Sequence, residues 1–168
     1  VSRWSASAHG GIAMDRFRFW QRWLEIVAWL ITGFGLLMAL FISTPLFQGF
    51  HSQIDPAFWP SGAIPQAAER YQSWVLSAWG ATVAGWGLLL LFVARVPFRA
   101  RQPWVWPAIA WSLVLWFALD TAASLRYGVI FNAALNGLIL LLAGIPLLAT
   151  RGAFSQPPPD GLGDPDAG

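Results

Sequence analysis

The residue best suited to chemistry in this sequence is Asp120, an acid within an otherwise apolar segment. An ionisable side chain is costly to bury in hydrocarbon, so such residues often line a substrate or ion path. Asn132 and Asn136 follow a short turn and are four residues apart, which places them on one face of a helix. Arg126 lies in the turn, within reach of Asp120. We therefore expect a polar cluster of Asp120, Arg126, Asn132 and Asn136.

This cluster has two interpretations. Asp120 lies only about 6–9 Å along the helix axis from the turn, at roughly 1.5 Å per residue. Headgroup water and Arg126 would then satisfy its carboxylate, and the cluster would be a hydrogen-bond network that fixes two helices together. In the other interpretation, the cluster contacts a substrate, an ion or a partner protein.

A second group of candidates lies in residues 44–66, where His51 and Asp55 are four residues apart. Two such side chains suggest a metal pair, but a metal site needs further ligands. Pro56 also argues against a continuous helix in this region. Trp59 and the neighbouring Phe residues are expected to lie at the membrane surface, in a re-entrant or capping segment. We predict no metal and no cofactor here.

Four apolar segments must position these residues. Hydrophobic residues make up 57% of the chain and charged residues 11%, too few charges to cover the surface of a soluble fold. Each segment approaches the roughly 20 residues that cross a hydrocarbon core about 30 Å thick. In lipid only helices or closed barrels satisfy the backbone, and the alternating pattern of a barrel is absent. The predicted spans are residues 20–42, 71–94, 104–123 and 129–149.

The ends of the chain differ in composition from these spans. Residues 1–13 are polar and rich in small residues, and Met14 opens a segment typical of a natural start. We expect residues 1–13 to be a disordered N-terminal extension and residues 14–152 to form the four-helix domain. The Pro- and Asp-rich residues 153–168 are expected to be a disordered tail.

The distribution of arginine predicts the orientation. Eight of the ten Arg residues lie before the first span, between the second and third, or after the fourth. Because cytoplasmic loops carry the excess of basic residues, both termini are predicted to be cytoplasmic. One of these residues, Arg22, is expected to form an ion pair with Glu25, three residues later on the same helix. The expected fold is an all-α integral membrane four-helix bundle.

Small residues mark the faces on which these helices pack. In lipid, helices associate through small residues that let their backbones approach closely. The second span carries Ser77, Gly80, Ala84 and Gly87 at helical spacing, and the fourth span carries Gly137. We expect these faces to pack against other helices. The alternative is a substrate path lined by small residues.

Tryptophan is abundant, with twelve copies. Several lie near the ends of spans, where an aromatic belt is expected. Trp79 and Trp86 are seven residues apart and share a deeper face of the second span. Lipid-facing packing is the simpler interpretation of this pair, and a ligand-binding aromatic box is the alternative.

Several functional classes lack the residues that they need. The chain has no Cys, which excludes thiolate metal sites, iron–sulfur clusters and Cys nucleophiles. No His lies in a predicted span, so bis-His haem ligation is absent, and no phosphate-binding loop, HExxH or GxSxG motif occurs. The Arg residues gather beside apolar spans, a pattern that favours lipid headgroups over nucleic acid. We expect a protein that is not an enzyme.

The segments IDPAFWP, WGATVAGWGLLLLFVARVPFRAR and WFALDTAASLRYGVIFNAALN resemble a family of small bacterial four-span membrane proteins with no assigned function. The resemblance covers most of residues 15–152. It implies a multi-pass protein of the bacterial inner (plasma) membrane, and it brings no activity and no site residue.

Two functions are compatible with these features. The first is a structural or accessory subunit, or a homo-oligomer, that packs against itself or a larger membrane complex through its small-residue faces. The alternative is a protein that binds or transports a small solute or lipid through an outer-side cleft between the third and fourth spans. Gly and Ala faces left uncovered in the monomer would favour the first function. An enclosed polar cavity that reaches Asp120 would favour the second.

Overall fold

The structure, a computed structural model, describes the backbone of residues 3–155 and the side chains from Met14 onward. All regular elements in this part of the chain are helices. The long or medium helices are α1 (Arg3–Phe41), α2 (Gln48–Phe58), α3 (Gln66–Val93), α4 (Val105–Arg126) and α5 (Ile130–Thr150). Three short helical turns connect or extend them: η1 (Pro45–Phe47), η2 (Ala94–Phe98) and η3 (Arg151–Phe154).

Four of the helical segments are long and apolar enough to cross a membrane. They are Met14–Phe41, Gln66–Phe98, Val105–Arg126 and Ile130–Phe154, and each overlaps one of the predicted spans. The prediction of an all-helical chain with four apolar helices is confirmed. By length and composition, these helices indicate a multi-pass membrane protein.

The prediction of disorder has a different outcome at each end of the chain. Helix α1 begins at Arg3, so its backbone runs through most of residues 1–13 as a helix, although composition predicts disorder there. At the other end, η3 carries the helical path to Phe154, just beyond the predicted domain boundary at residue 152. The rest of the predicted tail, from residue 156, lies outside the described residues.

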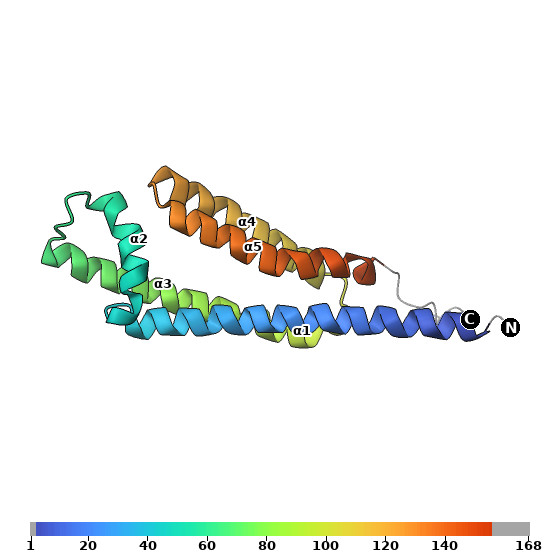
Figure 1. Cartoon of the computed structure of the whole chain (residues 1–168). Helices are drawn as coiled ribbons and strands as arrows, with labels where there is room; N and C mark the ends of the chain where they lie inside the picture. Colours follow the sequence, from blue (N-terminus) through green and yellow to red (C-terminus); the bar gives the residue numbers. More distant parts are fainter. Residues whose placement is uncertain (1–2, 156–168) are drawn as a thin grey trace, which may run out of the picture.

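The four long helices form two antiparallel pairs (Figure 1). Helix α1 packs against α3, and α4 packs against α5 across a tight turn in which Gly128 adopts a φ of +74°. Glycine takes this left-handed conformation without a steric cost. Helix α5 also contacts α1, but the two pairs diverge toward the end where α2 lies (Figure 1). The end of α5 lies toward the opposite end of the molecule, and the start of α1 extends beyond it (Figure 1).

The contact between α1 and α3 brings the two backbones together. A Cβ atom on Gly80 would lie 2.6 Å from the backbone nitrogen of Ala39, and one on Gly35 would overlap the backbone of Ala84. A Cβ atom on Gly87 would lie 2.6 Å from Thr32. This is the close approach that small residues permit in lipid. The partner of the small-residue face of α3 is therefore α1 of the same chain.

Two other predicted packing residues lie differently. Ser77, one turn before Gly80, is half-buried. Gly137 on α5 is also half-buried, but a Cβ atom there would meet nothing within 4 Å. The Gly137 position is thus free of a tight helix contact in the monomer.

Aromatic packing holds the two pairs together at the end opposite α2. Phe98 of η2 is fully buried, and its ring lies 5.8 Å from that of Phe17 and 4.9 Å from that of Phe154. Nearer the middle of the helices, the Trp23 indole of α1 donates a hydrogen bond of 3.0 Å to the carbonyl of Leu142 on α5. The pairs are therefore joined at one end and separate toward the other.

The predicted ion pair between Arg22 and Glu25 is wrong. Glu25 instead pairs with Arg95 of η2, with Nε and Oε2 3.2 Å apart. The Gln21 amide donates to Glu25 and also to the carbonyl of Ala94, at 3.2 Å. Arg22 is exposed, whereas the half-buried Glu25 faces the end of α3. The partner of Glu25 is set by the contact between α1 and η2, so the spacing of residues along α1 alone could not predict it.

Candidate functional site

The polar side chains of α4 and α5 meet near the turn between these helices. The Asn132 amide donates a 2.8 Å hydrogen bond to the Ser124 hydroxyl and lies 3.4 Å from each carboxylate oxygen of Asp120. The Asn136 amide donates to the Thr121 hydroxyl at 3.3 Å. The Ser124 hydroxyl in turn donates to the backbone carbonyl of Asp120 at 2.7 Å. The structure thus brings Asp120 and Asn132 together at one level of the hairpin, with Asn136 one turn deeper.

Arg126 does not join this network. Among the described residues, no ion pair links Arg126 to Asp120, and the Arg126 side chain is exposed. At about 100° per residue, six positions place the two side chains roughly 120° apart around α4. The expectation that Arg126 satisfies the Asp120 carboxylate is therefore not met.

An apolar cleft of about 210 Å³ lies between the two helix pairs. Helices α1, α3, α4 and α5 all contribute to its wall. Three half-buried indoles, those of Trp79, Trp86 and Trp116, face it together with aliphatic side chains such as Leu135. The Trp86 and Trp116 rings lie 5.8 Å apart and link α3 to α4. The paired tryptophans of the second predicted span thus line the cleft between the helix pairs.

Polar groups lie at one side of this cleft. Asn132 and Asn136 both belong to its wall, although Asn136 is almost fully buried. A second pocket, of about 250 Å³, is lined by Asp120 and Ser124 and shares Trp79 and Asn132 with the cleft. The two spaces therefore adjoin each other at Trp79 and Asn132, which belong to both walls.

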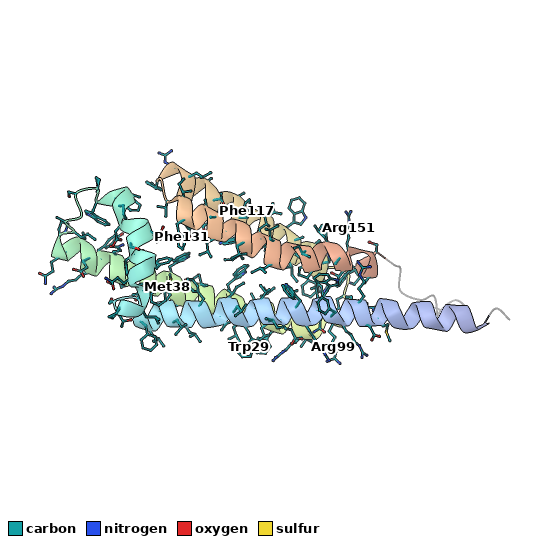
Figure 2. The ribbon with its side chains drawn as sticks, viewed as in Figure 1. Trp29, Met38, Arg99, Phe117, Phe131 and Arg151 are labelled. Carbon is teal, nitrogen blue, oxygen red and sulfur yellow. The ribbon has the colours of Figure 1, made fainter. Side chains whose placement is uncertain are left out.

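Helix α2 contributes to the wall of the Asp120 pocket. Ile54 and Phe58 of α2 line the pocket that contains Asp120. The Phe58 ring lies 6.2 Å from the Tyr127 ring at the α4–α5 turn, and the Phe50 ring lies 6.0 Å from that of Phe131. Figure 2 shows Phe131 on the side of α5 that is nearest to α2. Aromatic contacts thus bring α2 against the second helix pair.

Pro56 does not interrupt α2, contrary to the sequence-based expectation. The helix runs from Gln48 to Phe58, and the backbone N–H of Trp59 still donates to the Asp55 carbonyl at 2.8 Å. Pro56 lies in the last turn of this short helix. Its missing N–H therefore removes one hydrogen bond without breaking the helix.

The predicted loop residues His51 and Asp55 anchor α2. The His51 Nε2 atom lies 3.0 Å from the carbonyl of Ile42 at the end of α1, and Nδ1 lies 3.7 Å from Asp55. Asp55 accepts a 2.6 Å hydrogen bond from the Gln72 amide of α3. Trp59 follows the helix, and its ring lies 5.9 Å from that of Phe58. Among residues 14–155, no group of three or more His, Asp or Glu side chains is placed to hold a metal ion.

The position of the cleft differs from the predicted one. The sequence predicts a cleft between the third and fourth spans, but α4 and α5 pack directly against each other. The cleft lies between this hairpin and the α1–α3 pair. Sequence reasoning missed Leu135 and Ile139, which belong to the cleft wall with Asn132 and Asn136. Each of them follows one of the two Asn residues by three positions, and this spacing was the available signal.

No protein-family model, curated protein or solved structure matches this chain. The resemblance to small bacterial four-span proteins therefore stays a prediction, and the geometry of the cleft carries the functional argument.

Proposed function

We propose that this protein binds an amphipathic molecule of the membrane in the cleft between its two helix pairs. The observation that carries this proposal is that the tryptophan-lined cleft and the pocket of Asp120 adjoin and share Trp79 and Asn132 in their walls. Ligand sites are typically concave and mostly apolar, with a few placed polar groups, and measure roughly 300–1,000 Å³. The two adjoining spaces, of about 210 and 250 Å³, are each somewhat smaller and lie within this range when taken together. An apolar body would occupy the cleft, and a polar end would reach Asp120.

The packing of the small residues supports this choice over a purely structural role. The face of α3 that contains Gly80, Ala84 and Gly87 is covered by α1, so it is not available to a partner protein. Meanwhile Asp120 is the one carboxyl group in the described residues that line the cleft and its pocket. General acid–base catalysis usually needs a second positioned group. We therefore propose binding without catalysis.

The proposal places the protein in a bacterial inner membrane with both termini cytoplasmic. Arg99 and Arg151 lie toward the end of the molecule opposite α2 (Figure 2). Arg16, Arg18 and Arg22 belong to the first half of α1, on the same side. An excess of basic residues on one side supports a cytoplasmic location for that side. Helix α2 and the Asp120 pocket would then lie at the outer surface.

A photoreactive probe tests the proposed cleft. Purified protein in phosphatidylcholine nanodiscs would be irradiated with a diazirine derivative of octanol, and labelled peptides would be identified by mass spectrometry. We expect labelling of the cleft wall that excess octanol suppresses. Replacing Leu135, which lines the cleft, by Trp should fill the cleft and remove this labelling.

Leu141→Trp is the matched control, because Leu141 lies on the same helix but is exposed and away from the cleft. It should leave the labelling of the cleft wall unchanged. Labelling spread evenly over the lipid-facing residues, and equal in the two variants, would contradict the proposed function.

A structural or accessory role is the second candidate, and one observation favours it. Gly85, Gly137 and Gly144 have open space around their Cβ positions, so each permits another helix to approach. Crosslinking of the protein in nanodiscs at low protein density tests this role. A homo-oligomer that Gly137→Leu dissociates would support it, and a monomer at all densities would contradict self-association.

A further inference from the structure

The charge of the bound molecule follows from the surroundings of Asp120, and this inference rests on the proposed function. We propose that the site selects a lipophilic cation, such as an alkylammonium compound. Its positive group would lie against the Asp120 carboxylate, and its apolar body would extend into the tryptophan-lined cleft.

The first step concerns the unmatched charge of Asp120. Among the described residues no cationic side chain forms an ion pair with it, and Arg126 is exposed. Its two contacts with the Asn132 amide are 3.4 Å long, beyond the usual 2.7–3.2 Å of an N–H···O bond. The amide makes its better bond, of 2.8 Å, to Ser124. The carboxylate therefore retains most of its capacity to accept hydrogen bonds and to bind a cation.

The second step concerns the other polar atoms beside the cleft and the Asp120 pocket. The amide groups of Asn132 and Asn136 and the hydroxyl of Ser124 all donate within the hairpin. In the described residues, no donor bonds to the side-chain carbonyl oxygens of the two Asn residues, and no buried side-chain N or O atom lacks a partner. Each of these oxygens therefore keeps some accessible surface, and both residues belong to the wall of the cleft. This polar wall offers acceptors, which suit a cation and oppose an anion.

The third step concerns the aromatic rings that share a pocket with the carboxylate. Phe58 of α2, Trp79 of α3 and Tyr127 of the α4–α5 turn line the same pocket as Asp120. Aromatic faces attract cations within about 6 Å of the ring centroid, and cages of such rings recognise alkylated ammonium groups. The pocket thus offers one ligand both a carboxylate and these three rings, which we call the aromatic cage. Because Trp79 also lines the cleft, the apolar body of the ligand continues directly from this cage.

Three probes with the same octyl chain separate the role of charge from the role of the cleft. We would titrate octyltrimethylammonium, octanol and octyl sulfate into the protein in phosphatidylcholine nanodiscs by calorimetry, subtracting empty nanodiscs. We expect the cation to bind at least about tenfold more tightly than octanol, which corresponds to about 1.4 kcal/mol. Octyl sulfate should bind most weakly.

Asp120→Asn should weaken binding of the cation about tenfold or more. The affinity of this variant for octanol should stay within about twofold of that of the unmodified protein. Glu69→Gln is the matched control, because it removes one exposed carboxylate of the α2–α3 region outside the Asp120 pocket. It should leave both affinities within about twofold. Phe58→Leu, at an exposed position, should lower the affinity for the cation severalfold without changing the affinity for octanol. This variant tests the cage even if Asp120→Asn fails to fold.

The outcomes distinguish this inference from the proposed function. Equal binding of the cation and octanol, unchanged in Asp120→Asn or in Phe58→Leu, would overturn the cation preference and leave the cleft as a neutral binding site. If Glu69→Gln and Asp120→Asn lowered the affinity for the cation equally, the preference would come from surface charge. This result would also overturn the inferred cation site at Asp120. Binding of no probe above empty nanodiscs would remove the proposed function itself.

Discussion

The packing of α1 against α3 makes a sharp prediction about Gly80. A Cβ atom at this position would lie 2.6 Å from the backbone nitrogen of Ala39 and 2.9 Å from the carbonyl oxygen of Gly35. Both neighbours are backbone atoms, so neither moves by a change of rotamer. Gly80→Ala therefore forces the two helices apart along their closest contact.

The size of the effect follows from the overlap. An ordinary van der Waals contact starts at about 3.4 Å, so the helices must separate by the better part of 1 Å, which costs roughly 1–3 kcal/mol in a well-packed interface. The gain in helix propensity from Gly to Ala, up to about 1 kcal/mol, offsets part of this. We expect a net loss of about 1–2 kcal/mol in the free energy of unfolding for Gly80→Ala.

Gly85 on the same helix provides the matched control, because a Cβ atom there meets nothing within 4 Å. Gly85→Ala should leave the free energy of unfolding unchanged or raise it slightly. Unfolding would be followed for both variants in bicelles, by steric trapping or by titration with dodecyl sulfate. If Gly80→Ala were as stable as Gly85→Ala, the backbone contact between α1 and α3 would be refuted.

Two further predictions concern α2 and the orientation. Gln72→Met removes the 2.6 Å hydrogen bond to Asp55, so the amides of α2 should exchange hydrogen several times faster, whereas those of α5 should not change; unchanged exchange in α2 would argue against this anchor. The chain has no Cys, so single cysteines report on orientation directly. Ser52→Cys, exposed on α2, should react with an impermeant maleimide added outside cells, and Ala100→Cys, exposed after η2, should react only after lysis. The reverse pattern would invert the predicted orientation.

Part of the candidate site followed from local rules. The short connection around Gly128 requires α4 and α5 to be antiparallel neighbours, and counting residues back from it places Asp120 opposite Asn132. The structure has these two side chains 3.4 Å apart. Arg126 could not be placed in the same way, because its direction depends on rotation around the helix axis and not on distance along it.

The small-residue pattern shows where local rules end. Gly80, Gly87 and Gly137 all lie at helical spacing, and composition alone treats them alike. In the structure, the first two meet the backbone of α1 and the third meets nothing. A small residue permits close approach but does not select the partner, so the pairing depends on the complementary faces of whole helices.

By itself, the sequence determined the class of the protein, its four apolar helices and the level of Asp120 in the hairpin. Each of these depends on the cost of burying polar groups in hydrocarbon or on residues near one another in the chain. Only the tertiary structure decided that α1 pairs with α3, that the two pairs diverge, and that α2 covers the space between them. These features arise from contacts between distant segments, and they create the cleft that gives Asp120 its surroundings.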